Sequence, residues 1–474
     1  MITFIICLVL LIVAYFTYGR YLEHVCKIDS SASVPSERLY DGVDYVPMPR
    51  WRTFLIQLLN IAGTGPIFGA ILGACYGPVA FLWITLGGIF MGAMHDYISG
   101  VILVRNDGLS ITEIVARYLG KGAGAFMRVF SVILLLLVGV VFVVSPADIL
   151  SARFDFISRN WWLAIIIAYY FIATLLPIDK LIGKIYPLFG AALVFMALGL
   201  LGVLLFGDYT IPAMTLENLH INKANLPLVP TLFITIACGA ISGFHATQSP
   251  LMARCVNNEK ECRMVFYGSM ISESIIALIW AAIAMAFFYE DGGVSAVMAG
   301  HTPAWAVNEI ANTTLGIVGG ILAILGVVAA PITSGDTAFR SARLIIADVF
   351  HIEQRTKWKR LLICTPLFAV GIVLTFVDFD VVWRYFAWTN QALATVVLWC
   401  IVIYLNLNKR NIWVALPPAV FMTFICASFV FVSNQFFGLG TAPVAYICGG
   451  VVTLALTALM WWRLRSDNKA SLNK

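Results

Sequence analysis

Charged residues are scarce in this chain, and their scarcity excludes a soluble globular protein. Only 12% of the 474 residues are Asp, Glu, Lys or Arg, whereas soluble domains carry about a quarter. A surface that faces water needs charge, and there is too little here to cover a globule of this size. The net charge of +5 does not indicate a nucleic-acid partner, because the basic residues are scattered between apolar runs.

The sequence also lacks the motifs of common enzymes and of ATP-driven pumps. It contains no HExxH, GxSxG or CxxC cluster and no GxxxxGK[ST] loop. The ten cysteines lie mostly within apolar runs, which is typical of packing residues. The six histidines are dispersed along the chain, so we expect no metal centre made from them. We therefore predict no catalytic residues, and no cofactor other than a coupling ion, H⁺ or Na⁺.

Apolar segments dominate instead, at 61% of all residues. A helix needs about 20 apolar residues to cross about 30 Å of hydrocarbon, and lipid offers the backbone no hydrogen-bond partner, so the spans must be helical. The first segment has no basic residue before it and no cleavage site after it, so we expect it to be retained. The thirteen predicted spans are 2–18, 54–75, 78–104, 124–145, 160–178, 184–206, 229–250, 264–289, 315–334, 361–377, 382–405, 413–432 and 442–462.

The positions of the basic residues predict how the chain crosses the membrane. If the N-terminus is outside, 26 of the 30 Lys and Arg residues fall in cytoplasmic segments or the C-terminal tail. The remaining four are Arg153, Arg159, Lys223 and Arg384. Positive charge gathers on the cytoplasmic side of inner-membrane proteins. We therefore predict a multi-pass protein of the bacterial inner membrane, with the N-terminus outside and the C-terminus in the cytoplasm.

Two of the predicted spans contain helix-breaking residues near their middle. The second span is interrupted by Gly63, Thr64, Gly65 and Pro66, and the seventh by Gly239, Ser242 and Gly243. Kinks are common in membrane helices, so each break alone has an ordinary explanation. Two breaks five spans apart, in helices that run in opposite directions, instead indicate the substrate site of a transporter with inverted repeats.

This spacing divides the chain into four parts. We expect residues 1–53 to hold the first span and a cytoplasmic loop, and residues 54–206 the first five-helix repeat. Residues 229–405 would form the second, inverted repeat, and residues 406–474 two further helices and a short tail. The predicted fold class is therefore an all-α polytopic membrane protein of about thirteen spans, built as five plus five with one extra N-terminal and two extra C-terminal helices.

The freed backbone at the two breaks suggests which residues bind substrate. An unwound segment in lipid persists only if protein, water, substrate or an ion satisfies its polar groups. The N-terminus of a half-helix suits a carboxylate, and exposed carbonyls suit a cation. His245 lies just past the second break and can contact substrate, titrate, or simply pack. The candidate substrate-binding residues are Gly63, Thr64, Gly65, Pro66, Ser242, Gly243, Phe244, His245 and Gln248.

Polar residues inside the other spans are candidates for coupling ion or proton movement. Asp96 and Glu273 are the deepest ionisable groups, and an internal salt bridge is the alternative explanation for each. Thr333 and Ser334 lie opposite the first break in the repeat scheme and suit Na⁺, unless they merely bond their own helix. Asp336 follows them and can equally cap a helix. Residues 335–360 show an apolar and a basic face, which predicts a helix along the inner membrane surface.

Several segments resemble the carbon starvation protein A (CstA) family. They are DGVDYVP at 41–47, NIAGTGPIFGAILGACYGP at 60–78, GAMHDYISG at 92–100, ISGFHATQSP at 241–250 and TNQALA at 389–394. The resemblance implies an inner-membrane transporter with a LeuT-type fold that takes up peptides or pyruvate when carbon is short. The family's IAG-x-GP element corresponds to Ile61, Ala62, Gly63, Gly65 and Pro66, and its SGFHA element to residues 242–246. In span 9 the run 334–338 is shifted relative to the acidic run of longer members.

We therefore expect a secondary importer of small carboxylate-bearing nutrients, driven by H⁺ or Na⁺. Its partners would be the substrate and the lipid bilayer. An uncoupled channel or facilitator has the same hydropathy and would not accumulate substrate against a gradient. A nutrient sensor that retains a transporter fold is a further alternative, and it would need a partner protein.

Overall fold

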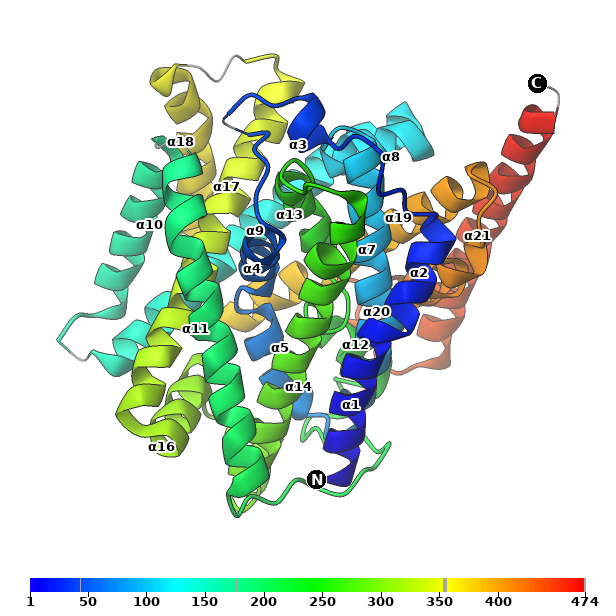
Figure 1. Cartoon of the computed structure of the whole chain (residues 1–474). Helices are drawn as coiled ribbons and strands as arrows, with labels where there is room; N and C mark the ends of the chain where they lie inside the picture. The colour runs from blue at the N-terminus through cyan, green and yellow to red at the C-terminus, as the bar shows by residue number, and fades with distance from the viewer. Residues whose placement is uncertain (43, 155, 176–177, 353–355, 473–474) are drawn as a thin grey trace.

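The computed structural model describes residues 1–474 except 43, 155, 176–177, 353–355 and 473–474. Every regular element in this described part of the chain is a helix. Figure 1 shows a bundle of long helices whose first and last residues lie at opposite ends of the molecule. This placement agrees with an odd number of crossings.

The helices of the first half lie over the first six predicted spans. Their bounds are α1 Ile2–Phe16, α2 Tyr18–Cys26, α3 Pro35–Arg38, α4 Arg50–Ala62, α5 Gly65–Ala74, α6 Val79–Leu82, a π-helical stretch Trp83–Ala93, α7 Met94–Arg105, α8 Ile111–Leu119, α9 Lys121–Arg153, α10 Arg159–Leu175 and α11 Ile178–Phe206.

The second half begins after a loop at residues 207–227. Its elements are a short π-helical turn Leu228–Leu232, α12 Phe233–Thr235, α13 Gly243–Ala253, short turns Glu259–Glu261 and Arg263–Gly268, α14 Ser269–Phe287, α15 Val294–Val297, α16 Pro303–Ala323, a π-helical turn Ile324–Val328, α17 Ala329–Val349, α18 Lys357–Leu374, α19 Phe379–Leu407, a turn Ile412–Val414, α20 Leu416–Val432 and α21 Pro443–Leu472.

Eight helical segments in the described residues are long and apolar enough to cross a membrane, and the bent pair α4 and α5 makes a ninth. Helical structure lies over all thirteen predicted spans. The multi-span, all-helical class is therefore confirmed, while the count of thirteen stays a prediction.

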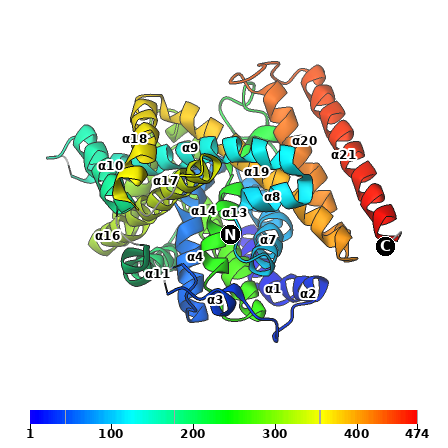
Figure 2. The same ribbon diagram turned by 90° about the horizontal axis from the view of Figure 1, so that it is seen from above.

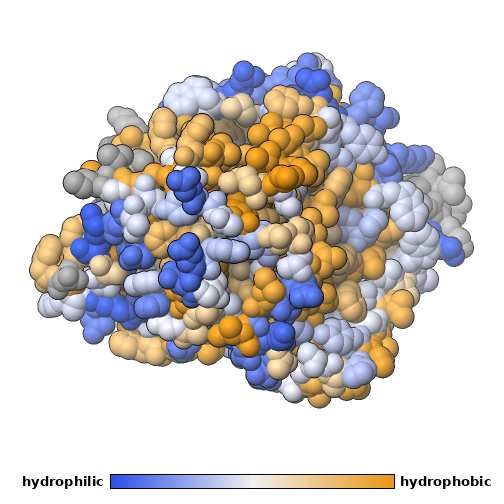
Figure 3. All heavy atoms as spheres, turned by 90° about the horizontal axis from the view of Figure 1, so that it is seen from below, coloured by the Kyte–Doolittle hydropathy of each residue, from blue (hydrophilic) through white to orange (hydrophobic). Residues whose placement is uncertain are grey.

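The helices differ in how much of their surface is buried. Figure 2 shows α13 and α14 near the middle of the bundle, with α10 and α21 at opposite edges. Helix α14 is almost entirely buried, whereas α1 and α21 expose rows of large apolar side chains such as Ile6, Val9, Val451 and Leu454. An apolar exposed belt is what hydrocarbon requires. On the end face of Figure 3, hydrophilic side chains are interspersed with apolar ones.

The prediction of a surface helix after span 9 is wrong. Residues 329–349 form one helix, α17, which continues the helical run that covers span 9 and packs against α9 along its length. Asp336, Arg340 and Arg343 on this helix are buried rather than facing solvent. An amphipathic pattern shows that a helix has a polar face, but it does not say whether water or protein covers that face.

Candidate functional site

The first predicted break is confirmed. Helices α4 and α5 meet at a bend of 48°, with Gly63 and Thr64 between them. A Cβ atom at Gly63 would overlap the ring of Phe142 on α9, so this position has no room for a side chain. Pro66 sits in the first turn of α5, where its missing N–H costs no helical hydrogen bond. The sequence thus breaks the helix at a point where a neighbouring helix approaches closely.

The second predicted break is confirmed as well. The chain leaves helical geometry at Ile236 and resumes it at Gly243, the first residue of α13. The side-chain oxygen of Asn390 on α19 accepts hydrogen bonds from the Ser242 hydroxyl (3.1 Å) and from the backbone N–H of Phe244 (2.7 Å). Asn390 therefore caps the N-terminus of α13 from another helix.

The two breaks run in opposite directions and touch. In Figure 1, α4 and α5 descend while α12 and α13 ascend. A Cβ atom at Gly65 would overlap the sulfur and Cβ of Cys238, which lies within the second break. Gly69 and Gly73, one and two turns further along α5, approach Thr235 and Ile236 in the same way. This glycine face lets the backbone of α5 pack closely against the second broken segment.

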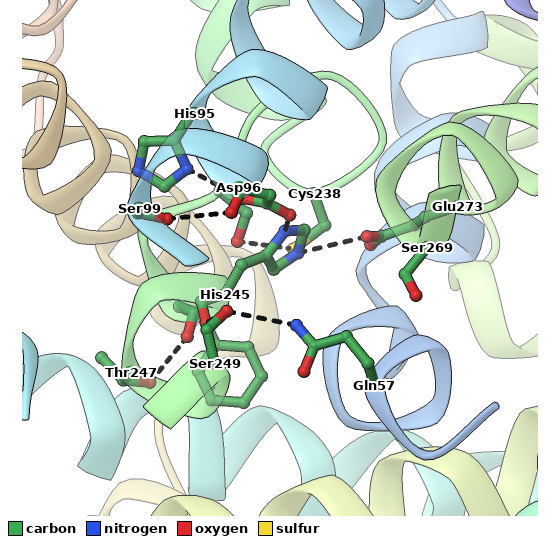
Figure 4. Close-up of polar contacts among 12 residues, drawn as sticks. Gln57, His95, Asp96, Ser99, Cys238, His245, Thr247, Ser249, Ser269 and Glu273 are labelled. Carbon is green, nitrogen blue, oxygen red and sulfur yellow. Dashed lines mark hydrogen bonds and ion pairs between the residues drawn. The ribbon is translucent and has the colours of Figure 1, made fainter. Parts of the chain in front are cut away.

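Beside this junction, three ionisable side chains from three helices converge (Figure 4). His245 of α13 places Nδ1 2.7 Å from Asp96 Oδ2 on α7, and Nε2 3.2 Å from Glu273 Oε2 on α14. All three side chains are 0% exposed. The imidazole thus joins two carboxylates that no solvent reaches in this conformation. We call His245, Asp96 and Glu273, together with His95, the acid–histidine cluster.

A second histidine completes the cluster. His95 Nδ1 lies 2.8 Å from the other carboxylate oxygen of Asp96, so each oxygen of Asp96 meets one imidazole. Two of the six histidines, dispersed in the sequence, thus meet at one carboxylate. His95 Nε2 is buried with no hydrogen-bond partner among the described residues.

The contacts of His245 bear on where the cluster can hold its protons. When Nδ1–H donates to ionised Asp96, the lone pair of Nε2 faces Glu273, and an ionised carboxylate there would be repelled. The 3.2 Å contact between Nε2 and Oε2, which lacks hydrogen-bond geometry, is favourable when a proton sits either on the imidazole or on the carboxyl group. With His245 charged, both acids ionised and His95 neutral, the cluster carries one net negative charge. One further proton makes the cluster neutral, and a neutral cluster costs far less free energy to bury than a charged one.

Two members of the cluster form, together with Cys238, a set of metal-ligand atoms. Cys238 Sγ, His245 Nε2 and a Glu273 oxygen lie within 4.8 Å of one another, and all three residues are buried. Asp96 holds the opposite ring nitrogen of His245, as a second-shell carboxylate does for a metal-bound histidine. These residue types suit a transition-metal ion.

Further polar groups on α4 and α13 are buried beside the breaks. Both amide atoms of Asn60, the Thr64 hydroxyl and the Gln248 side-chain oxygen have no hydrogen-bond partner among the described residues. The Gln248 amide N–H donates to Thr247 Oγ1 at 3.0 Å. Phe244 packs edge to face on Phe142. Buried polar atoms without partners are costly, and they are the groups that a polar ligand or water can satisfy.

Thr333, Ser334 and Asp336 lie on α17, which contacts α4, α9 and α10. The Ser334 hydroxyl donates to the carbonyl of Leu59 (3.0 Å), close to the end of α4, and Thr333 donates to Ala330 within its own helix (2.8 Å). Asp336 pairs with Arg340 at 3.3 Å. The structure thus brings Ser334 to the first break, while a Na⁺ site there stays a prediction.

Sequence reasoning missed His95, Cys238 and Asn390 as members of the site. His95 is adjacent to Asp96, and Asn390 is an amide inside a predicted span, so both carried a signal of buried polarity. Cys238 looks like any apolar packing cysteine in the sequence. Only its position opposite Gly65 and beside His245 distinguishes it.

The fold and the junction of two broken helices define a polytopic membrane protein of the LeuT type. The crystal structure of MhsT in complex with L-phenylalanine superposes with a TM-score of 0.55 at 16% identity, covering 86% of this chain and 98% of that one. At this identity the likeness concerns the fold alone.

The profile of the family "Carbon starvation protein CstA" matches residues 1–151 and 143–318. The chain belongs to this family.

Its relatives include proteins of very different length. An uncharacterised membrane protein of Haemophilus influenzae is 42% identical over 340 residues, 61% of this chain and 91% of that protein. The peptide transporter CstA of Escherichia coli is 27% identical over 64% of this chain and 52% of its own length. The E. coli pyruvate/proton symporter BtsT is 27% identical over 59% and 48%. The chain thus matches about half the length of the relatives that are named as transporters.

Proposed function

We propose that this chain is a secondary importer that carries small carboxylate-bearing nutrients, peptides or pyruvate, into the cell together with protons. The observation that carries the proposal is the position of His245, buried between Asp96 and Glu273 beside the contact of the two helix breaks. A proton-binding group at the pivot of an inverted-repeat fold is placed where alternating access can expose it to either side.

The charge of the cluster provides a reason for coupling. With one net negative charge, the cluster repels a carboxylate substrate in a medium that screens little. Binding of one more proton removes that repulsion, so substrate and proton enter the junction together. The freed backbone of the breaks and the unpaired atoms of Asn60, Thr64 and Gln248 would then receive the substrate's polar groups.

The substrate class is supported by the relatives rather than by the site alone. Two of them are named for peptide transport and for pyruvate/proton symport. Both substrates carry a carboxylate, which suits the half-helix N-termini at Gly65 and Gly243. The same family membership supports a role in the response to carbon starvation.

We place the protein in the bacterial inner membrane, with the N-terminus outside. The distribution of 26 of 30 basic residues supports this orientation. In Figure 1 the cytoplasmic segments of this scheme, including α3, α8 and the C-terminus, lie together at the upper end.

Sodium is the alternative coupling ion. The Ser334 hydroxyl and the Leu59 carbonyl already converge at 3.0 Å, as two oxygen ligands of a Na⁺ site would. Asp336 pairs with Arg340, which does not exchange protons, whereas Asp96 and Glu273 face the imidazole of His245, which can; this difference favours Asp96 and Glu273 as proton carriers.

Reconstitution separates these possibilities. Purified protein in liposomes is given labelled dialanine or pyruvate under an imposed inward proton gradient, an inward sodium gradient or none. We expect accumulation above the external concentration with the proton gradient only. Accumulation with sodium alone would move the coupling to Thr333 and Ser334. Equilibration without accumulation would indicate a facilitator, and no uptake of either compound would favour a sensor.

A transition-metal ion is a second candidate ligand of the cluster, favoured by the convergence of Cys238, His245 and Glu273. Titration with Co²⁺ tests it, because a thiolate ligand adds a charge-transfer absorption band. The band should appear in the wild type and be absent from Cys238→Ser if a metal binds there. No band in the wild type would reject this candidate and leave the proton proposal intact.

A further inference from the structure

We propose that a separate cavity on the N-terminal side of the molecule is an entry site that selects zwitterionic substrates, with Arg384 binding the carboxylate and Asp380 the ammonium group. This inference rests on the proposed import function and deepens it, because it names short peptides and amino acids, rather than simple keto acids, as the preferred class.

The cavity lies between the outer half of the first broken helix and the start of α19. It has a volume of about 320 Å³ and is lined by residues of α5, α12, α15, α19 and the loop before α12. Ligand pockets are typically about 300–1,000 Å³, so the cavity suits a molecule of the size of a dipeptide. In the predicted topology its lining loops face the outside.

Two opposite charges on α19 line this cavity one helical turn apart. Arg384 is one of only four basic residues outside the cytoplasmic segments, and Asp380 precedes it by four positions. Among the described residues, Arg384 takes part in no ion pair. A guanidinium that makes no ion pair within the protein can bind a planar carboxylate in the cavity through two parallel hydrogen bonds.

The remaining lining provides apolar room and neutral donors. Leu72, Trp383 and Phe429 offer surface for a side chain of variable size. His220 stacks against Tyr76 with ring centroids 5.0 Å apart, and its Nδ1 accepts a hydrogen bond from the Asn222 backbone N–H. Burial, aided by the charge of Arg384, lowers the pKa of His220, so that this imidazole is neutral at neutral pH. Arg384 is therefore the cationic group of the cavity.

The contact of α5 with Thr235 and Trp383 separates the cavity from the junction of the two helix breaks. Thr235 lines the cavity, and Cys238 of the junction follows three residues later. Gly69 of α5 packs against the Thr235 carbonyl and the Trp383 ring, so nothing passes there while the helices touch. A substrate bound by Arg384 and Asp380 would lie on the outer side of this contact.

Equilibrium binding to the purified full-length protein tests the assignment. The probes are dialanine, which carries both charges, N-acetyl-dialanine and pyruvate, which lack the ammonium, and dialanine amide, which lacks the carboxylate. We expect dialanine to bind at least about tenfold more tightly than each of the other three, because each lost ion pair with a cavity charge is worth about that factor.

Substitutions test which residue binds the carboxylate of the ligand and which binds its ammonium group. Arg384→Gln should weaken dialanine binding at least about tenfold, and Arg384→Lys, which keeps the charge, should weaken it less. Asp380→Asn should weaken dialanine but leave N-acetyl-dialanine unchanged. Lys223→Gln is the matched control, because it removes a basic residue from the loop before α12, and Lys223 itself does not line the cavity. Equal dialanine affinity in Arg384→Gln and the wild type would overturn the proposal, as would pyruvate binding as tightly as dialanine.

The measurement is repeated with Asp96→Asn, which removes the carboxylate between the two histidines but not the cavity. We expect this variant to lose transport and to retain the charge-dependent binding. Charge-dependent binding in a protein that transports nothing would contradict the import function alone. Transport with binding that ignores Arg384 and Asp380 would contradict the entry site alone.

Discussion

The imidazole of His245 joins carboxylates that belong to two different helices. Its Nδ1 contact with Asp96 orients the ring, and its Nε2 contact with Glu273 is where a proton can be held or released. Because His95 occupies the other oxygen of Asp96, that carboxylate is held from both sides. Neither oxygen of Glu273 has a hydrogen-bond partner among the described residues, and only Oε2 lies within ion-pair distance of His245, so Glu273 is held by fewer contacts than Asp96.

Replacing Glu273 by Gln should therefore uncouple transport without dismantling the site. The amide keeps a hydrogen-bonding group opposite His245 Nε2 but does not take up a proton at physiological pH. We expect proton-driven accumulation in liposomes to fall to the equilibrium level, while exchange of labelled for unlabelled substrate continues. Glu309→Gln, which changes an exposed carboxylate on α16, is the control and should behave as the wild type. Full proton-driven accumulation by Glu273→Gln would contradict the role of this carboxyl group.

At the scale of elements, the glycine face of α5 decides how closely the two breaks approach. Gly65, Gly69 and Gly73 recur every four residues, and an added Cβ at Gly65 or Gly73 would overlap a side chain of the second break. The same face lies between the entry cavity and the cluster. In the proposed transport cycle, its contacts would separate and re-form whenever a substrate passes.

Gly65→Ala should separate the broken helices by overpacking, which costs about 1–3 kcal/mol. We expect a lower thermal midpoint and strongly reduced uptake, and partial recovery of both in Gly65→Ala combined with Cys238→Gly, since the overlapped atoms are those of Cys238. Gly202→Ala on α11 is the control, because a Cβ there meets no atom within 4 Å. Unchanged uptake by Gly65→Ala would contradict the claim that uptake needs close packing of α5 against Cys238.

For the whole molecule, the two chain ends and the basic residues define a direction. The N- and C-termini lie at opposite ends of the bundle in Figure 1. Lys223 and Lys409 are exposed, in loops that the predicted topology places on opposite sides of the membrane.

This direction is testable with single cysteines in a cysteine-free background that retains uptake. A membrane-impermeant maleimide should label Lys223→Cys in intact spheroplasts and Lys409→Cys only after permeabilisation. The reverse pattern would invert the topology and place the entry cavity on the cytoplasmic side.

Much of this architecture was predictable because its causes are local. The breaks at residues 63–66 and 239–243 follow from Gly and Pro within apolar runs, and both are found. Asp96, Glu273 and His245 stand out as polar groups in apolar surroundings. The helix at 335–349 was misplaced because its basic face suggested water, whereas Arg340 turns inward to Asp336 and to a carbonyl of α10.

By itself, the sequence determined the membrane class, the helical structure and the places where helices break, because hydropathy and backbone chemistry act over a few residues. Only the tertiary structure decided that Asp96 meets His245 across 149 positions, that Cys238 faces Gly65, and that Arg384 lines a cavity. Such contacts depend on how helices pack. In lipid, packing is set by shape and by the pairing of buried polar groups, which are properties of the assembled bundle rather than of any one segment.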